Sequence, residues 1–340
     1  MIFRRHVIRI LAGGLISRLF AESYTDVTPC AGAPRSEVDR LLDANPSLSH
    51  VPARLTKYSA SATVMLFSIP LVSRGGVGSG YAVVQEAACP GGTGISIQFG
   101  AGSWPEAARG LNRFGLIREV TLESPAGEPE ECAYYAFMTA SPEKDITQAK
   151  QALTTSGDVL PCIAAQGHGS RGTFASRVQN LELPSRLTWR DADKLAARVH
   201  DAIAGAPCLP EGERGGASTF LYSLRRAMLD SGAETPRALF FNSKRFLLDT
   251  RKERDAAAGA RLAERRVTTK PDSVMRLSAV LTNRATGHQT PFHVWYEEGS
   301  EGAPPLRFEY QAKSFLRLAF EADPAPPALK EQLVAKERQG

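Results

Sequence analysis

The sequence predicts a mainly β fold with a few helices (α+β), in which a curved antiparallel sheet or half-barrel ends in a C-terminal β-meander. Three observations predict it. Apolar residues follow a period of two from Tyr58 onward, turn residues recur at short intervals, and four short apolar segments follow one another between residues 274 and 321. With 340 residues, of which 43% are hydrophobic, the chain is long enough for one large domain or two ordinary ones.

The first 21 residues have the composition of a signal peptide. Arg4, Arg5 and Arg9 precede a short apolar run at 10–16, and a small-residue cleavage site ends at Ala21. Because two apolar residues follow Arg4-Arg5 at the positions that a twin-arginine signal prefers, that export route is favoured. We therefore expect a periplasmic or secreted protein. The alternative is a basic amphipathic start on a cytoplasmic protein.

The remaining sequence gives the expected domain organisation. Residues 22–57 are rich in Pro, Ala and Ser and predict a linker with one short helix. Residues 58–321 form a single β-rich domain, and 322–340 form a disordered or short helical tail. No segment contains the roughly 18 apolar residues that a transmembrane helix needs, so none is predicted.

Charge and cysteine usage limit the expected partners. Four of the 41 Lys and Arg residues lie in the first 21 positions, so the rest of the chain nearly balances its 36 acidic residues, and we expect no nucleic-acid partner. The cysteines contain no Cys-x-x-Cys pair, which disfavours a zinc or redox site. If the protein is exported, one or two disulfides are expected, with the pairing open among Cys30, Cys89, Cys132, Cys162 and Cys208.

Several segments have distinct local patterns. The glycines at 75–80 lie between two apolar strands and predict a hairpin loop, because no Lys-Ser or Lys-Thr follows them as in a phosphate-binding loop. Further strands are expected at 116–123, 133–139, 173–183 and 239–248, the last with a turn at 242–243. Helices are expected at 143–153, after Thr188 and at 218–231, and the charged residues 251–266 form an exposed helix or loop.

A further helix is predicted between Ser103 and Gly115. Ser103 is a capping residue, proline follows in the first turn, and Gly115 ends the segment. Arg109 and Arg113 then lie one helical turn apart on the same face. Two aligned arginines can bind a carboxylate or phosphate; the alternative is that both are solvated or pair with an acidic residue such as Glu119.

Histidine is the first place to look for catalysis. His168 and Ser170 lie in the glycine-rich segment 166–172, but the nucleophile elbow needs glycine where His168 stands. A glycine loop is the expected structure, and a hydrolase that uses His168 and Ser170 remains the alternative function. His288 and His293 have no Cys, Asp or Glu at ligand spacing between them, so we predict no metal site and no cofactor.

Aromatic residues concentrate at the C-terminus. In a strand over 290–297, Phe292 and Tyr296 face one side, while Trp295 faces the other. Most of these rings are expected in the core, and the rest could line an apolar groove if helices cover the sheet only partly.

The same region carries a family resemblance. Val294-Trp295-Tyr296 and Pro305-Leu306-Arg307 resemble the last strands of a group of uncharacterised exported bacterial β-rich proteins, of the domain-of-unknown-function kind. Those proteins are distantly similar to the half-barrels of periplasmic lipoprotein carriers, which implies a curved sheet with helices on its concave side. The resemblance covers only the C-terminal strands, and the helix expected at 103–115 has no counterpart in it.

These observations lead to one functional prediction. We expect a non-enzymatic protein of the cell envelope that binds an apolar or lipid-like ligand, or an envelope partner, on the concave face of its sheet. Apolar tails would contact Phe292 and Tyr296, and an anionic head would contact Arg109 and Arg113 at the rim.

Overall fold

The computed structural model describes most of the expected β-rich domain. The described residues are 53–66, 69–89, 92–139, 159–170, 173–191, 203, 208–211, 218–230, 236–241, 244–300 and 302–324. The predicted signal peptide, nearly all of the linker, Cys30, the helix at 143–153 and most of the tail lie outside these residues.

All strands belong to one antiparallel sheet. It contains 14 strands in the order β8-β7-β6-β5-β4-β3-β2-β1-β14-β13-β12-β11-β10-β9. The first and last strands of the sequence, β1 and β14, therefore pair with each other within the sheet. The bounds are β1 (Ala53–Leu66), β2 (Ile69–Cys89), β3 (Gly92–Ser103), β4 (Phe114–Glu123), β5 (Pro129–Thr139), β6 (Val159–Ser170), β7 (Thr173–Pro184), β8 (Cys208–Glu211), β9 (Arg237–Phe241), β10 (Lys244–Arg254), β11 (Val274–Asn283), β12 (Gln289–Glu297), β13 (Arg307–Lys313) and β14 (Leu316–Ala322).

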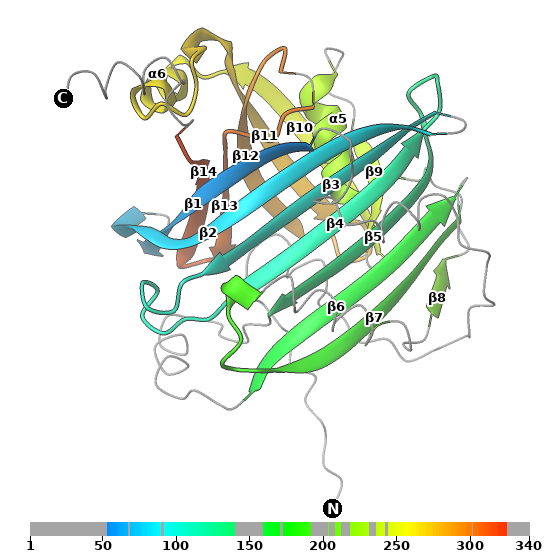
Figure 1. Ribbon diagram of the computed structural model, residues 1–340, viewed down its shortest axis with the longest axis horizontal. Coiled ribbons are helices and arrows are strands. Elements are labelled where there is room, and N and C mark those ends of the chain that lie inside the picture. Colours follow the sequence, from blue (N-terminus) through cyan, green and yellow to red (C-terminus); the bar gives the residue numbers. More distant parts are fainter. Residues whose placement is uncertain are drawn as a thin grey trace, which may run out of the picture.

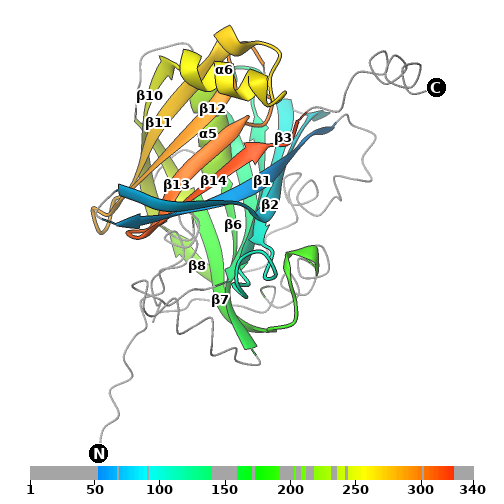
Figure 2. The ribbon, with the colours of Figure 1, turned by 90° about the vertical axis from the view of Figure 1, so that its left-hand side faces the viewer.

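The sheet curls until its two halves face each other, with β1 to β7 forming one wall and β9 to β14 the other (Figures 1 and 2). Side chains from both walls share one buried cluster, which includes Tyr134 and Phe174 from the first wall and Phe241, Leu277 and Phe292 from the second. This curled antiparallel sheet confirms the predicted fold class.

The helices take two different places. α5 (Phe220–Leu229) lies between the walls, where Phe220 and Ala227 join the shared cluster. α6 (Ala256–Glu264) covers the outer face and buries Leu262 against Trp295. Two short 3-10 helices complete the described structure: η2 (Trp189–Asp191) and η3 (Pro271–Ser273).

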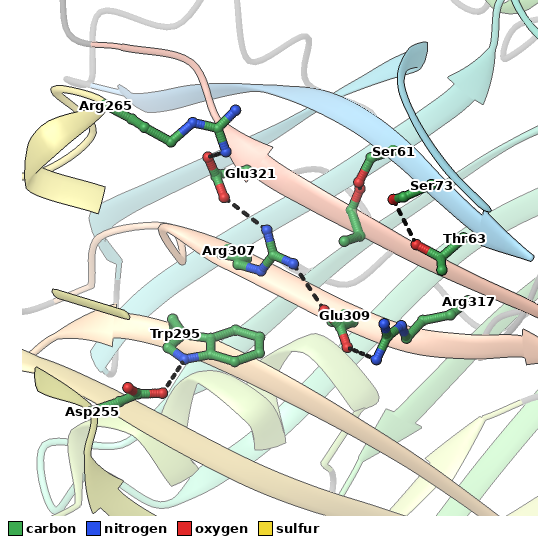
Figure 3. A network of polar contacts seen from close by, with 11 residues as sticks. Ser61, Thr63, Ser73, Asp255, Arg265, Trp295, Arg307, Glu309, Arg317 and Glu321 are labelled. Carbon is green, nitrogen blue, oxygen red and sulfur yellow. Dashed lines mark hydrogen bonds and ion pairs between the residues drawn. The ribbon is translucent and has the colours of Figure 1, made fainter. Parts of the chain in front are cut away.

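The outer face of β13 and β14 carries a chain of ion pairs (Figure 3). Arg307 contacts Glu321 at 2.7 Å and Glu309 at 2.8 Å, and Arg317 contacts Glu309 at 3.3 Å. Arg265, just after α6, also pairs with Glu321. Both carboxylates therefore have arginine partners on the outer face. The inner side of β13 and β14 carries mainly apolar side chains.

The C-terminal meander is confirmed. β11, β12, β13 and β14 pair antiparallel in sequence order, and their bounds lie within two residues of those predicted. The hairpin of β9 and β10 and the helix at 218–231 are also present, although β10 continues to Arg254 and α6 occupies the rest of the charged segment.

The helix predicted at 103–115 is wrong. β3 ends at Ser103, a single turn follows, and β4 begins at Phe114. Arg109 and Gly110 both have positive φ, 55° and 84°, which ends the turn. The Ser103 hydroxyl donates to Leu111 O at 2.6 Å and accepts from Arg113 N at 2.8 Å, so a residue type that favours a helix cap closes a β3–β4 connection instead.

Two glycine segments are strands, not loops. The glycines of 75–80 lie inside β2, where a bulge opposite Ala60 and Ser61 includes Gly76 with a φ of 66°. The segment at 166–170 lies in β6, where a Cβ at Gly167 would collide with the Tyr134 ring. β1 also begins at Ala53, five residues inside the predicted linker. The strands of the first wall are therefore longer than the sequence pattern indicates.

Candidate functional site

The interior of the curled sheet is not filled throughout. A cavity of about 570 Å³ lies between the walls. Its lining is almost entirely apolar and comes from β1 to β3, the ends of β4 and β5, α5 and β12 to β14. The aromatic contributors are Tyr58, Phe99, Phe114, Phe220, Phe292, Phe308, Tyr310 and Phe320.

The cavity exists because one part of the sheet presents small side chains inward. Ala60 and Ala62 of β1, Gly78 and Ala82 of β2, and Ala101 of β3 all line it. Alternate residues of a strand face opposite sides, and these inward positions contribute little volume. Larger side chains of the same strands, Tyr58 and Phe99, also line the cavity and contact Phe308 of the opposite wall.

α5 forms one wall of the cavity and is held by polar contacts at its N-terminal end. Glu119, on the inner face of β4, accepts from Tyr222 N at 3.0 Å. The Tyr222 hydroxyl donates to Glu123 at 2.6 Å. A carboxylate at a helix N-terminus is favourable because it meets the unpaired N–H groups and the positive end of the helix dipole. The apolar side of α5, through Leu221, Leu224 and Met228, lines the cavity.

Glu119 is nearly inaccessible to water, with 1% of its surface exposed. Burial raises the pKa of this carboxyl to about 7, although hydrogen bonds from Thr219 and the first turn of α5 oppose the shift. The interior therefore contains one carboxyl that titrates near neutrality, at the junction between the helix and the wall.

One end of the cavity reaches solvent and is basic. Leu71 and Val72 line the cavity and are 57% and 63% exposed. Arg74 lies two residues further along β2, pairs in register with Ala62, and therefore shares its inward face. Arg109 lines the same end from the β3–β4 connection.

Two more cations line this end. Arg113 is half-buried and donates to Asn112 O at 2.8 Å, and Lys313, at the turn between β13 and β14, is buried. Among the described residues that line the cavity, Glu309 is the only acidic one, and its carboxylate is engaged by Arg307 and Arg317 on the outer face. The basic end therefore carries no compensating carboxylate from the cavity lining.

The opposite end is covered and neutral. Arg225 of α5 is 8% exposed and pairs with Glu86 at 2.5 Å. The segment 302–305 lines this end, and Tyr58 fixes it by donating to Pro305 O at 2.7 Å. Gly302 is buried against Glu86 and Arg225. An entering molecule would therefore use the basic end.

The structure brings three of the four predicted ligand-binding residues to this cavity. Arg109, Arg113 and Phe292 line it, although the arginines come from a β3–β4 connection and not from a helix. Tyr296 is not part of the lining. Its side chain packs in the shared core, and burial raises its pKa to about 12. The sequence did not indicate Arg74 and Lys313, whose inward placement depends on the bulges in β2 and β13.

The residues of the alternative hydrolase lie elsewhere. His168 Nε2 is 2.9 Å from Glu131 Oε1, so the histidine has a carboxylate partner on a regular strand. His168 pairs in register with Ala133, which belongs to the buried cluster on the outer face of β4 to β6. His168, Ser170 and Glu131 are absent from the cavity lining.

The described residues also bear on metal binding, free thiols and membrane-spanning helices. In the described part of the chain, no group of three or more His, Cys, Asp or Glu residues could hold a metal ion. Cys89, Cys132 and Cys162 are free thiols. None of the described helices combines the length and apolar character needed to cross a membrane.

No protein-family model and no curated protein matches this chain. Among solved structures, it is similar to a "Beta-barrel-like Protein of Domain of Unknown Function DUF1849" from Brucella abortus, with a TM-score of 0.36 and 9% sequence identity over 81% of this chain and 96% of that one. A likeness of this degree carries no functional argument, so any function has to be inferred from the cavity.

Proposed function

We propose that this protein binds an elongated apolar molecule in its interior cavity, with an anionic head group at the basic end. The observation that carries the proposal is the unfilled apolar space. Protein interiors are normally packed as densely as organic crystals, with few voids larger than a water molecule. A cavity of about 570 Å³ lies within the range of small-molecule binding sites, roughly 300–1,000 Å³.

The shape and chemistry of the lining support the choice of ligand. An apolar chain entering past Leu71 and Val72 would meet Phe99, Phe292 and Phe308 and release water from apolar surface. Hydrocarbon needs no hydrogen bond, so the scarcity of polar groups inside favours such a chain over a polar solute.

The basic end supports the choice of head group. Arg109 and Arg113 can each donate two N–H groups to one carboxylate or phosphate, and charge-assisted hydrogen bonds are the stronger kind. A head group held there would remain near solvent, because Arg74 and Arg109 are exposed. The ligand would therefore lie with its head at the opening and its tail inside.

A titration with a fluorescent fatty acid tests this function. Saturable binding is expected for the wild type, and affinity about tenfold lower is expected for Arg109→Ala/Arg113→Ala, because each lost pair at a partly exposed site is worth up to about 1 kcal/mol. Arg251→Ala, an exposed arginine of β10 outside the cavity lining, is the matched control. Absence of saturable binding to the wild type would reject the proposal.

We also propose that the protein acts outside the cytoplasm, on the basis of the signal-like residues 1–21. Fusing residues 1–30 to a reporter that is active only after export would give activity and cleavage. Changing Arg4 and Arg5 together to Lys should abolish export if the twin-arginine route is used. A reporter that stays inactive and uncleaved would contradict export by any route.

A hydrolase is the second candidate, and the observation that favours it is the His168–Glu131 pair at 2.9 Å. A carboxylate that orients a histidine is part of many nucleophile-activating arrangements. Turnover of a p-nitrophenyl ester by the wild type, lost in both His168→Ala and Ser170→Ala, would support this candidate. Equal turnover by all three proteins would remove it.

A further inference from the structure

We propose that the start of β2 from Ile69 to Arg74, here called the tip, docks this protein on an anionic phospholipid bilayer, with the basic end of the cavity facing the membrane. Docking itself requires only the surface of the protein. The exchange of ligand between bilayer and cavity, which docking would permit, rests on the proposed function.

The first observation is a group of exposed apolar side chains at the start of β2. Ile69, Leu71 and Val72 are 62%, 57% and 63% exposed, and they are three of the five large hydrophobic residues exposed to this degree among the described residues. The end of the hairpin extends beyond the neighbouring strands on the left of Figure 1. Apolar side chains that protrude in this way can insert into the boundary between lipid head groups and acyl chains.

The second observation is charge. Arg74 follows the apolar group on the same strand, and Arg109 lies at the same end of the cavity. Both are exposed, and neither has a hydrogen bond or ion pair with any residue in the described part of the chain. Each basic residue near an anionic membrane surface contributes about 1 kcal/mol of attraction, or roughly a fivefold increase in binding.

The third observation is that the exposed apolar group continues into the cavity lining. Leu71 and Val72 are both exposed at the tip and part of the cavity lining. A hydrocarbon chain leaving a bilayer at this point would therefore meet apolar surface along its whole path. The neutral, covered end with the Arg225–Glu86 pair would face away from the membrane.

The small size of the patch favours a bilayer over a protein. Stable protein interfaces usually involve about 20–30 residues on each side. Three apolar side chains with two flanking arginines are too few for such an interface, but they are sufficient for an interfacial anchor supported by charge.

Tryptophan fluorescence can locate the tip directly. The full chain with Ile69→Trp should show a blue shift and quenching with vesicles that contain brominated phosphatidylcholine and phosphatidylglycerol. Leu55→Trp is the matched control, because Leu55 is 56% exposed but lies near the other end of β1. The Leu55→Trp variant should fluoresce more strongly than the wild type, and vesicles should not change the contribution of the added tryptophan. Equal quenching of both variants, or of neither, would overturn the proposal.

A second measurement uses vesicle flotation. Ile69→Asp should bind vesicles with phosphatidylglycerol at least about tenfold more weakly than the wild type, because it removes an apolar side chain that would insert into the bilayer and adds a charge that anionic lipid repels. Ile69 is outside the cavity lining, so fatty-acid binding in solution should be unchanged. Unchanged flotation would overturn docking, whereas failure of the wild type to bind fatty acid would overturn only the proposed ligand site.

Discussion

The interior of this protein contains a filled region and a hollow region, built from the same sheet. In the filled region, between β5 to β7 and β9, the Tyr134 ring lies 4.7 Å from Phe241 and 5.9 Å from Phe174, which in turn lies 5.3 Å from Phe240. In the hollow region, β1 to β3 present several Ala and Gly residues inward beside Tyr58 and Phe99, and a cavity of about 570 Å³ remains.

The two regions differ in the size of the side chains that their strands present inward. Both regions contain long antiparallel strands, with register shifts in the β1–β2 pairing and none in the β5–β6 pairing. Both place apolar residues inward, so the hydrophobic effect drives both to close. In the filled region, rings of the two walls stack on each other. In the hollow region, Tyr58 and Phe99 contact Phe308 of the opposite wall, but the alanines and glycines beside them leave space. α5 lies at the boundary, with Phe220 in the filled core and Leu224 in the cavity lining.

The largest expected effect is on the filled region. Phe241→Ala should lower the free energy of unfolding by about 3–5 kcal/mol, because it removes a fully buried ring and leaves a void against Tyr134. Denaturant unfolding followed by circular dichroism measures the change. A loss under about 1 kcal/mol would mean that the two walls do not pack together here.

The titration of Glu119, which holds the N-terminal end of α5, tests the boundary between the filled and hollow regions. Its folded pKa of about 7 lies above the ordinary 4.5, so the folded state binds more protons than the unfolded state between these values, and stability falls as pH rises through them. Glu119→Gln should remove this dependence. It should be more stable than the wild type at pH 8, by up to roughly 3 kcal/mol, and equal to it near pH 4.5.

The measurement is thermal or urea unfolding of both proteins at acidic, intermediate and mildly basic pH. Glu119→Gln keeps an oxygen acceptor for Tyr222 N, so α5 should remain in place. Parallel stability curves for the two proteins would show that the carboxyl titrates normally and that the helix is not docked on it.

A pair of glycines sharpens the comparison. A Cβ at Gly167 would collide with the Tyr134 ring in the filled region, so Gly167→Ala should destabilise the protein by about 1–3 kcal/mol. Gly75, on the solvent-exposed part of β2, has no atom within 4 Å of an added Cβ, and Gly75→Ala should change stability by less than about 0.5 kcal/mol. Similar losses for both would contradict the close contact between Gly167 and the Tyr134 ring.

Much of the fold could be predicted from the sequence, because its signals are local. The period of two, the pairing of β9 with β10, the turns between the last four strands and the amphipathic 218–231 segment each depend on residues close together in the sequence. The prediction for 103–115 is wrong for the same reason. Its cap and proline favour a helix locally, but the pairing of Gly102 with Phe114 returns the chain into the sheet.

The candidate site was predictable only in part. Arg109, Arg113 and Phe292 were expected at a cleft and line the cavity, whereas Tyr296 faces the same side of β12 but lies in the filled core. Distinguishing Phe292 from Tyr296 requires knowledge of the opposite wall. The same is true of the alanines of β1, whose small size signals a cavity only once the side chains around them are known.

The smallest expected effect comes from filling the hollow region. Ala62→Phe and Ala101→Phe each add a ring at a position that lines the cavity, where space is already present. Stability should show little net change, within about 1 kcal/mol in either direction, since the added apolar burial is offset by local adjustment. Chemical unfolding measures it. A loss above about 3 kcal/mol, as in an overpacked core, would mean that the space is already filled.

The most direct test of the account is fatty-acid binding by these cavity-filling variants, measured with the same fluorescent probe at equal protein concentration. The account predicts saturable binding by the wild type and by Phe241→Leu, a milder change in the filled region. It predicts affinity at least about tenfold lower for Ala62→Phe and Ala101→Phe, because the ring occupies volume that the acyl chain needs. Unchanged affinity in both cavity-filled proteins, with folding intact, would contradict the claim that the hollow region is the binding site.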